Sequence, residues 1–328
     1  MSSNLRLWWL ACAIGCAACD ERVCADQEPR THSLPAKLSQ TGLFSDVASE
    51  RLETGVFSYA PEFALWSDGA SKRRFIALPH GSRIDSHDAS DWAFPEGTKL
   101  WKEFSQGDEH LETRLLQKTG PGAGDWAAAA YVWRADQSDA ELAPYGAVNV
   151  LATTHDVPAS GECFGCHDGR PGRVLGFSAV QLAARSYDAP ERLSDAAREA
   201  LLSDPLPRLD VPGSARERAA IGYLHANCSH CHNQSTTALA GSKCFNPNDR
   251  LSFQLDFSLP TQELSSVEST PAYRTALGEV VERGNPDASK VVELMSKRSG
   301  GLNQMPPLGT DKVDERGLAL IREWIGSL

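Results

Sequence analysis

Two short stretches of the sequence place cysteine and histidine at the same spacing. In each, two cysteines are separated by two residues and a histidine follows at once: the first motif is Cys163, Cys166 and His167, and the second motif is Cys228, Cys231 and His232. Two thiols one helical turn apart can form thioethers with the two vinyl groups of one porphyrin, and the adjacent histidine then lies beneath the iron. The spacing is the attachment pattern of a c-type haem, so we expect two covalently bound haems, each with one iron.

The same cysteines could instead hold a structural zinc or act as redox dithiols. The two pairs lie 62 residues apart, from residue 166 to residue 228, whereas about 15–20 residues usually separate the two halves of a zinc ribbon. Neither pair lies in the strand-helix context of a thioredoxin-like dithiol. A histidine directly after both pairs, in a chain with 9 histidines among 328 residues, further favours haem.

A methionine in a proline-containing loop is a candidate for the sixth ligand of the second iron. Met305 lies 73 residues beyond His232, in "LNQMPPLGTD", and Pro306 and Pro307 argue against the interior of a helix. The alternative is that this methionine fills an apolar gap. We expect His232 and Met305 to be the axial ligands of the second haem iron, and Met295, in "SKVVELMSKR", to be a core residue.

The first motif has no comparable methionine, because none follows it until Met295. We expect His167 to hold the first iron, which then has another sixth ligand or an open position. His155, eight residues before the motif, is the candidate ligand, with His80 and His110 as further possibilities. Taken singly, these histidines and two near the second motif are expected at the surface: His80, His110, His155, His225 and His230.

A helix is expected to deliver the second motif. The stretch "GSARERAAIGYLHANCSHCH" begins with a capping box formed by Ser214 and Glu217, and apolar residues follow at helical spacing. The last residues, "DERGLALIREWIGSL", repeat the helical period. Two terminal helices of this kind, one carrying the haem motif and one an aromatic residue, resemble the class I cytochrome c fold, in which they cross and pack. We expect a cytochrome c-like domain over residues 214–328.

The region before the first motif predicts β-structure instead. Apolar and polar residues alternate over 111–115, and Trp126, Ala128, Ala130 and Val132 form another run with a period of two. Turns with glycine at 107–108 and 120–122 separate these runs. We expect an antiparallel sheet or sandwich. It belongs to a β-rich domain over residues 41–203, which carries the first motif.

The boundary between the two expected domains lies in "SDPLPRLDVPG", which has three prolines and a terminal glycine. Residues 204–213 are therefore predicted to be a linker. The fold class that follows is α+β, with a β-rich amino-terminal domain and an α-helical, cytochrome c-like carboxyl-terminal domain.

The amino terminus has the pattern of an export signal. Arg6 precedes the apolar run "LWWLACAIGCAAC", which is too short to cross a membrane, and the charged "DER" follows. We expect a signal peptide over residues 1–19, a linker over 20–40, and a location in the periplasm. "AIGC" and "CAAC" also resemble lipoprotein cleavage sites, so the alternative to simple cleavage is membrane attachment through a lipid on Cys16 or Cys19.

The net charge limits the possible binding partners, and the cysteine count leaves one possible disulfide. The formal net charge of −11 argues against nucleic acid, which needs a basic face, and suits docking to a basic protein. Three of the nine cysteines lie in the signal and four in the two motifs. Cys24 and Cys244 remain, and these two could form a disulfide.

Beyond the motifs, the sequence resembles a family of exported bacterial dihaem c-type cytochromes. The resemblance is carried by "TGLF", "LWSDGASKRRFIALPHGSRI", "WAFPEGTKLWKEF", "LETRLL", "CFGCH" with "RVLGFSAVQL", "ANCSHCHN" and "MPPLG", and it extends from about residue 41 to the end. It implies a β-rich amino-terminal region, a cytochrome-like carboxyl end and a covalent haem on each of the two motifs.

These features predict an electron carrier that passes single electrons between redox partner proteins. Ligation by His232 and Met305 closes the second iron and raises its potential, so electrons are expected to run from the first haem to the second. An enzymatic alternative is a dihaem peroxidase with an open first iron, although such enzymes repeat two cytochrome-like domains. A third alternative is a recognition module, in which tryptophans of the β-rich region form a ligand platform or simply fill a core: Trp66, Trp92, Trp101, Trp126 and Trp133.

Overall fold

The computed structural model describes most of the chain after residue 33. The described ranges are 34–170, 172–183, 192–206, 209–233, 250–257, 264, 266–300, 303–307 and 309–328. The predicted signal peptide lies outside the described residues, as do the two candidate lipid sites, Cys16 and Cys19, and the possible disulfide partners, Cys24 and Cys244.

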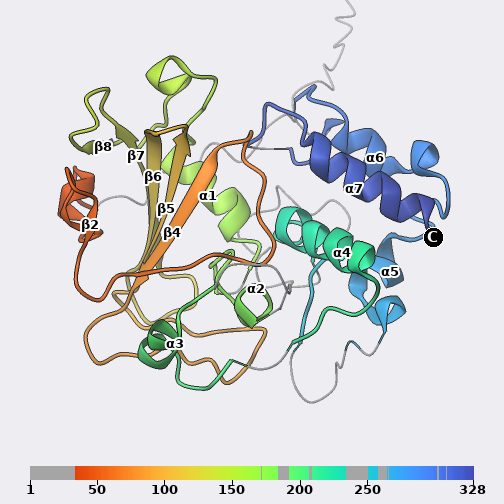
Figure 1. The fold of residues 1–328 in the computed structure, drawn as a ribbon, viewed down its shortest axis with the longest axis horizontal. Coiled ribbons are helices and arrows are strands. Elements are labelled where there is room, and N and C mark those ends of the chain that lie inside the picture. Colours follow the sequence, from red (N-terminus) through yellow and green to blue (C-terminus); the bar gives the residue numbers. More distant parts are fainter. Residues whose placement is uncertain are drawn as a thin grey trace, which may run out of the picture.

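A six-stranded antiparallel sheet forms the left side of the molecule in Figure 1. Its strands lie in chain order and are β3 (Phe57–Ser58), β4 (Ser71–Ala77), β5 (Lys99–Gln106), β6 (Glu109–Lys118), β7 (Trp126–Trp133) and β8 (Ala140–Leu142). The β5–β6 hairpin turns at Gly107, whose positive φ of 61° suits glycine. A separate two-stranded ribbon consists of β1 (Phe44–Asp46) and β2 (Arg51–Leu52). The predicted antiparallel sheet is confirmed, as a single large sheet with this small ribbon.

Helices make up the rest of the α+β fold, which confirms the predicted class. Three lie in the sheet half (residues 34–206): α1 (Ser160–His167), α2 (Ala179–Ala183) and α3 (Asp195–Leu201). Four lie in the helical half (residues 209–328): α4 (Ala215–Cys228), α5 (Pro271–Ala276), α6 (Lys290–Met295) and α7 (Glu315–Gly326). Short 3₁₀ turns cover Leu38–Gln40, Val150–Ala152, Val267–Ser269 and Pro286–Ala288.

The predicted capping box starts α4. The Ser214 hydroxyl accepts from the Glu217 amide at 3.3 Å, and the Glu217 carboxylate accepts from the Ser214 amide at 2.7 Å. α4 then packs against α7, where Gly317 faces Tyr223 so closely that a Cβ at residue 317 would lie 2.4 Å from the tyrosine ring. The missing side chain of Gly317 is therefore what permits the close approach of these two helices.

Both faces of the sheet are buried. One face packs against the amino-terminal segment through Phe75, Trp101 and Leu115, which meet Leu38 and Phe44. The other face turns toward α1 and belongs to a core that continues through the helical half, with members that include Ile76, Leu116, Phe164, Leu224, Ile321 and Trp324. Two polar residues of this second face are buried as well, since Glu112 is fully inaccessible to solvent and Arg74 is 7% exposed, whereas Lys102 and Arg114 are partly buried.

Contacts cross the predicted boundary at residues 204–213. Phe63, in the sheet half, packs where Gly222 of α4 has no side chain, since a Cβ at residue 222 would lie 2.0 Å from its ring. Asn227 of α4 accepts a hydrogen bond from the Trp66 amide at 2.7 Å and donates to the Ala64 carbonyl at 3.2 Å. These contacts fix α4, and the motif at its end, against the sheet half.

Four of the five tryptophans of the β-rich region are core residues rather than a surface platform. Trp92, Trp101, Trp126 and Trp133 are all buried, and only Trp66 is partly exposed. The indole of Trp133 donates to the Thr113 hydroxyl at 3.0 Å, and that of Trp101 donates to the Thr41 hydroxyl at 3.1 Å. Four buried indoles cannot present a ligand platform at the surface, so that reading of the tryptophans is wrong.

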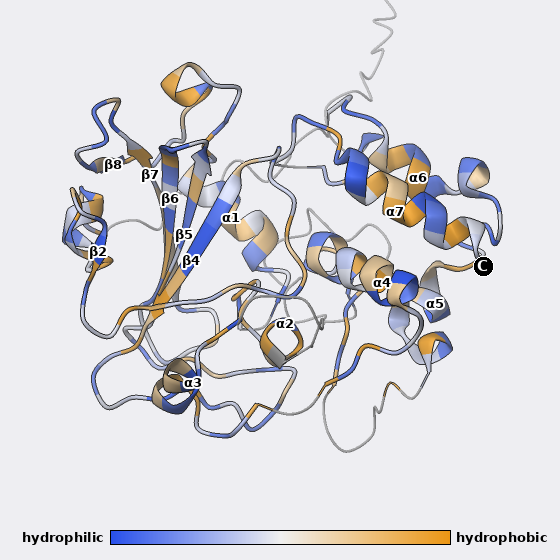
Figure 2. Cartoon of the chain, viewed as in Figure 1, coloured by the Kyte–Doolittle hydropathy of each residue, from blue (hydrophilic) through white to orange (hydrophobic). Residues whose placement is uncertain are grey.

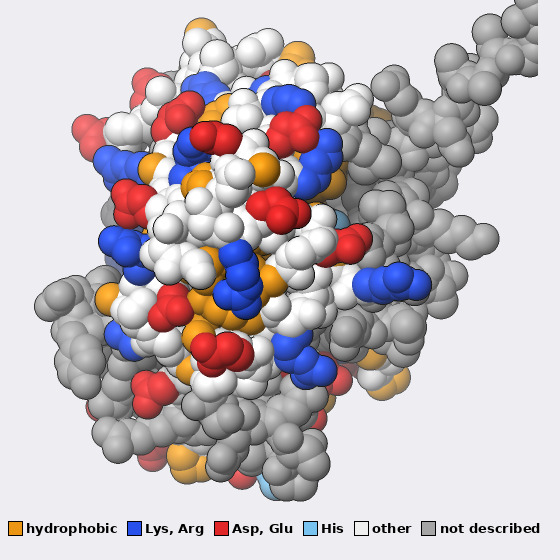
Figure 3. Space-filling model, turned by 90° about the vertical axis from the view of Figure 1, so that its right-hand side faces the viewer, with side chains coloured by type: hydrophobic (Ala, Val, Ile, Leu, Met, Phe, Trp, Pro, Cys, Tyr) orange, Lys and Arg blue, Asp and Glu red, His pale blue; other side chains and the backbone are white. Residues whose placement is uncertain are grey.

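The face of the molecule on the helical side carries both signs of charge (Figure 3). On the helical side of the molecule, acidic and basic side chains alternate around a small apolar area, so the net negative charge is not gathered there (Figure 3). None of the helices in the described part of the chain is long and apolar enough to span a membrane.

The α4–α7 contact gives a stability prediction. We expect Gly317→Ala to destabilise the fold by about 1–3 kcal/mol, because the new methyl group must displace the Tyr223 ring. Gly326→Ala, on the same helix, is the matched control: its Cβ would meet only Pro286, at 3.9 Å. Alanine is also the better helix former, so this control is expected to be neutral or stabilising by up to about 1 kcal/mol. Urea unfolding of both variants measures the difference, and equal midpoints would contradict the close-packing argument.

Candidate cofactor-binding sites

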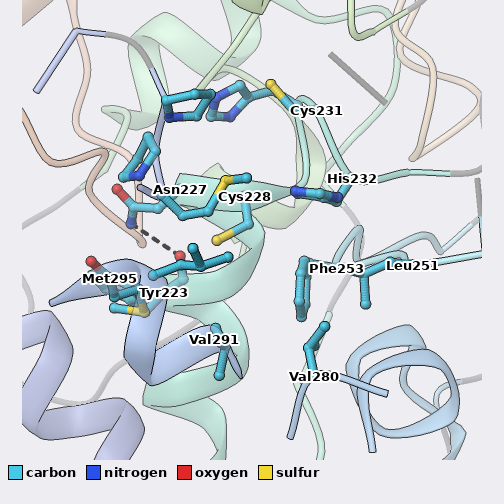
Figure 4. A pocket seen from close by; sticks show the side chains of 15 residues that line it. Tyr223, Asn227, Cys228, Cys231, His232, Leu251, Phe253, Val280, Val291 and Met295 are labelled. Carbon is cyan, nitrogen blue, oxygen red and sulfur yellow. Dashed lines mark hydrogen bonds between the residues drawn. The ribbon is translucent and has the colours of Figure 1, made fainter. Parts of the chain in front are cut away.

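The second motif lies where α4 ends. Cys228 is the last residue of the helix, and one further turn follows, in which the His232 amide donates to the Cys228 carbonyl at 2.8 Å. A pocket opens beside this turn, with about 1020 Å³ of space free of protein atoms, including its part open to solvent. Figure 4 shows the Cys228 and His232 side chains at this pocket, with an apolar wall that includes Leu251, Phe253, Val280 and Val291.

Met305 lines the same pocket, although it is 73 residues beyond His232 in the chain. Its loop is fastened to α6, because the Met305 amide donates to the Leu294 carbonyl at 3.0 Å. Pro306 and Pro307 follow it along the pocket wall. The structure therefore brings His232 and Met305 to one cavity, and their ligation of an iron stays a prediction.

Met295 is a core residue, as predicted. It is the last residue of α6, only 6% of its surface is exposed, and it belongs to the main core. Its side chain also borders the pocket. The helical half thus offers two methionines to the second motif, one on a helix and one in the proline-containing loop.

The second pocket is a neutral, apolar environment. Burial raises the pKa of Cys228 to about 12 and also raises the pKa of Cys231, so both thiols are protonated. Burial lowers the pKa of His232, whose Nδ1 is buried and has no hydrogen-bond partner among the described residues. Two thiols, an orphaned imidazole nitrogen and an apolar cavity fit a covalently attached porphyrin. Redox dithiols have lowered thiol pKa values, so this environment argues against that alternative.

The first motif occupies α1, a short helix whose amino-terminal Ala159 amide donates to the Glu162 carboxylate at 2.7 Å. His167 is the last residue of this helix, and its Nδ1 lies 2.5 Å from the Arg173 carbonyl oxygen. A carbonyl can only accept, so Nδ1 carries the proton and Nε2 keeps its lone pair. Metal-ligating histidines are commonly oriented by such a bond, so His167 fits the role of an iron ligand.

The surroundings of the first motif are buried but carry charge. Burial and, to a smaller extent, the charge of Lys102 lower the pKa of His167 to about 3. Burial raises the pKa of Cys163 to about 11, which the nearby charge of Arg114 opposes. Burial also raises the pKa of Cys166, which the charges of Lys102 and Arg114 oppose. The first motif thus faces cations of the sheet, whereas the second faces an apolar wall.

The candidate sixth ligand of the first iron, His155, is engaged with a carboxylate. Its Nε2 lies 2.8 Å from the Glu112 carboxylate, and its ring lies beside Phe104. One ring nitrogen is thereby occupied, and ligation by His155 stays a prediction. His110 lies between Glu50 and Glu103, at 3.0 and 3.2 Å.

The expectation of surface histidines is correct for His80 and wrong for the others. His80 is exposed, whereas His110 and His155 are largely buried against carboxylates. His225 and His230 are buried too. His225 accepts a hydrogen bond from the Leu255 amide at 3.1 Å, and burial lowers its pKa to about 3. It therefore ties α4 to the segment 250–257 as a neutral side chain.

The two motifs meet in space. Gly169, just after the first motif, packs on the backbone of His230, inside the second: a Cβ at residue 169 would lie 1.5 Å from the His230 carbonyl oxygen. The Asn233 side-chain amide donates to the Gly169 carbonyl at 2.9 Å and to the Ser229 carbonyl at 2.7 Å. Sequence reasoning missed both Gly169 and Asn233, whose roles depend on a contact across 64 residues.

Among the described residues, no group of three or more His, Cys, Asp or Glu side chains could hold a metal ion.

The contact between the motifs gives a second prediction. We expect Gly169→Ala to lower the free energy of unfolding by about 3 kcal/mol, because a methyl group cannot fit against the His230 carbonyl without a backbone shift. Gly172→Ala is the control, since its Cβ would have ordinary contact with the Trp92 carbonyl at 3.4 Å. Denaturant unfolding measures both. A Gly169→Ala variant as stable as Gly172→Ala would show that the two motifs are not in this contact.

Comparison with known proteins gives no relative for this chain: no family model, no curated protein and no solved structure matches it.

Proposed function

We propose that the protein is an exported dihaem c-type cytochrome that passes single electrons between redox partner proteins. The observation that carries the proposal is the pocket at the end of α4, which collects Cys228, Cys231, His232 and Met305. A protein that needed these cysteines for zinc alone would have no use for a methionine loop and an apolar wall at the same place.

Each residue of the pocket has a role in this proposal. Cys228 and Cys231 would supply the thioether links, while His232 and Met305 would hold the iron. The haem supplies a one-electron couple when it is bound. The apolar wall excludes water, and the methionine ligand favours the reduced form, so both raise the potential of this site. The packing of α4 on α7 supports a cytochrome c-like helical half, because class I cytochromes c pair their terminal helices in this way.

A relay between two haems is supported by the contact of the motifs. Gly169 and His230 touch, so the two attachment points are held in one core rather than on separate domains. His167, with its proton fixed on Nδ1, would hold the first iron through Nε2. The first motif has no methionine ligand, so a haem there would have the lower potential and would pass electrons to the second motif.

Export is part of the proposal, because bacterial c-type haems are attached outside the cytoplasm. The apolar run after Arg6 supports it. The protein then resides in the periplasm, either free after cleavage or anchored there by a lipid on Cys16 or Cys19.

A peroxidase is the second candidate function, and one observation favours it. Both methionines in the described part of the chain, Met295 and Met305, border the second pocket, so neither serves the first motif. A first iron held by His167 alone would keep an open position for peroxide. Peroxide-dependent oxidation of a reduced electron donor would identify this activity. If no such oxidation is measured, electron transfer stands as the proposed function.

The haem content is the first test. We expect two covalent haems per chain, and no zinc, in protein exported through a c-type maturation system, as measured by a pyridine haemochrome assay with metal analysis. Cys163→Ala with Cys166→Ala should reduce the haem count to one, as should Cys228→Ala with Cys231→Ala. Stoichiometric zinc without haem would overturn the proposed function.

The axial methionine is the second test. We expect Met305→Leu to lower the reduction equilibrium constant of the second haem at least tenfold, about 59 mV for one electron, because leucine cannot ligate iron. Met295→Leu is the matched control: it makes the same change in the same pocket and should cost less than about 1.5 kcal/mol of stability. Spectroelectrochemical titration measures both potentials. Equal effects of the two substitutions would assign Met305 to packing instead of ligation.

A further inference from the structure

A row of three cations crosses the sheet beside the first motif. Arg74 on β4 lies directly opposite Lys102 on β5, and Lys102 lies directly opposite Arg114 on β6. Residues directly opposite one another on neighbouring strands point to the same face, about 5 Å apart. The three side chains therefore form a cationic row, Arg74, Lys102 and Arg114, that spans about 10 Å.

The cationic row lies on the buried face that turns toward α1. The charges of Lys102 and Arg114 both act on the Cys166 thiol, which places this part of the row near the first motif. Figure 2 shows β4 as hydrophilic along the part that passes α1 and apolar at its other end. The apolar end carries Phe75 and Ile76, which contribute to the two cores.

Two of the three cations have no partner among the described residues. Arg114 is paired, since its Nε donates to the Glu112 carboxylate at 2.9 Å, and that carboxylate also meets His155. Arg74 is only 7% exposed, yet its guanidinium makes no hydrogen bond or ion pair within the described part of the chain. The Lys102 ammonium has no such partner there either. The neighbouring Lys72, by contrast, bonds to the Ser67 hydroxyl at 3.2 Å.

This arrangement is costly for a protein without an anion. Like charges directly opposite on neighbouring strands are destabilising, and a buried charge without a partner, as at Arg74, is destabilising as well. The cost is visible at Lys102, whose pKa falls to about 7 because of burial and the charges of Arg74 and Arg114. A single bound carboxylate would offset both effects, and the planar fork of arginine suits it.

We propose that Arg74, Lys102 and Arg114 form a carboxylate-binding site beside the first motif. Carboxylates reach this place from one of two sources: the propionate groups of a haem attached to Cys163 and Cys166, or a free carboxylate ligand. The propionate source rests on the proposed function, whereas the row itself does not depend on it.

The first arm of the test detects propionates. It compares the resonance Raman propionate bending bands of the holoprotein with those of Lys102→Gln, Arg74→Gln and Lys99→Gln. Lys99 lies on the same strand but on the opposite face, where its ammonium donates to the Thr41 carbonyl, so its substitution removes equal charge away from the row. We expect the bands to shift in the first two variants, to be unchanged in Lys99→Gln, and to return in the charge-retaining Lys102→Arg.

The second arm detects a free carboxylate. Succinate is titrated into the wild-type protein and Lys102→Gln while the thermal unfolding midpoint is followed. A saturable rise in the wild type that is lost in Lys102→Gln assigns the site to a free ligand, and it needs no haem. If the bands of Lys102→Gln and Arg74→Gln match those of Lys99→Gln and the wild type ignores succinate, the carboxylate site is wrong. Two haems per chain in that same preparation would leave the proposed function standing.

Discussion

The contact between Gly169 and the His230 carbonyl is the constraint that organises this molecule. It joins the turn after α1 to the turn after α4, and the Asn233 amide locks it by bonding to both sides. Because α1 rests on the sheet and α4 rests on α7, this backbone contact links the sheet half to the helical half, together with the contacts that Phe63 and Asn227 make across the same boundary. The separation of the two motifs is then set by a contact of main-chain atoms.

Local signals in the sequence predicted the elements well. The capping box of Ser214 and Glu217 starts α4 as expected, and the glycine turn at residue 107 closes the β5–β6 hairpin. These features depend on neighbours within a few residues, so the local sequence is enough to predict them. The position of Met305 in the same pocket as the second motif could also be anticipated, because it lies in a proline-containing loop after that motif.

Burial that depends on tertiary contacts could not be predicted from the local sequence. Arg74 stands in the polar stretch "SKRRF" and is nevertheless buried, which follows only from the tertiary packing around β4. His110 and His155 read as surface residues because their carboxylate partners, Glu103 and Glu112, are recognisable as partners only once the strands are paired. Gly169 carries no local sign of its role, since the carbonyl that it faces lies beyond residue 200.

The two sites differ in their electrostatics, and this difference bears on the direction of electron flow. In the proposed function, a haem at the first motif would gain one negative charge on reduction, so unpaired cations beside it would raise its potential and oppose the difference expected from Met305 ligation at the second motif. A carboxylate bound to Arg74 and Lys102 would cancel that effect and leave the axial ligands in control. Neutralising the cationic row would therefore favour the proposed flow from the first haem to the second. The same anion that relieves the charges of the sheet would leave the order of the two potentials to the axial ligands.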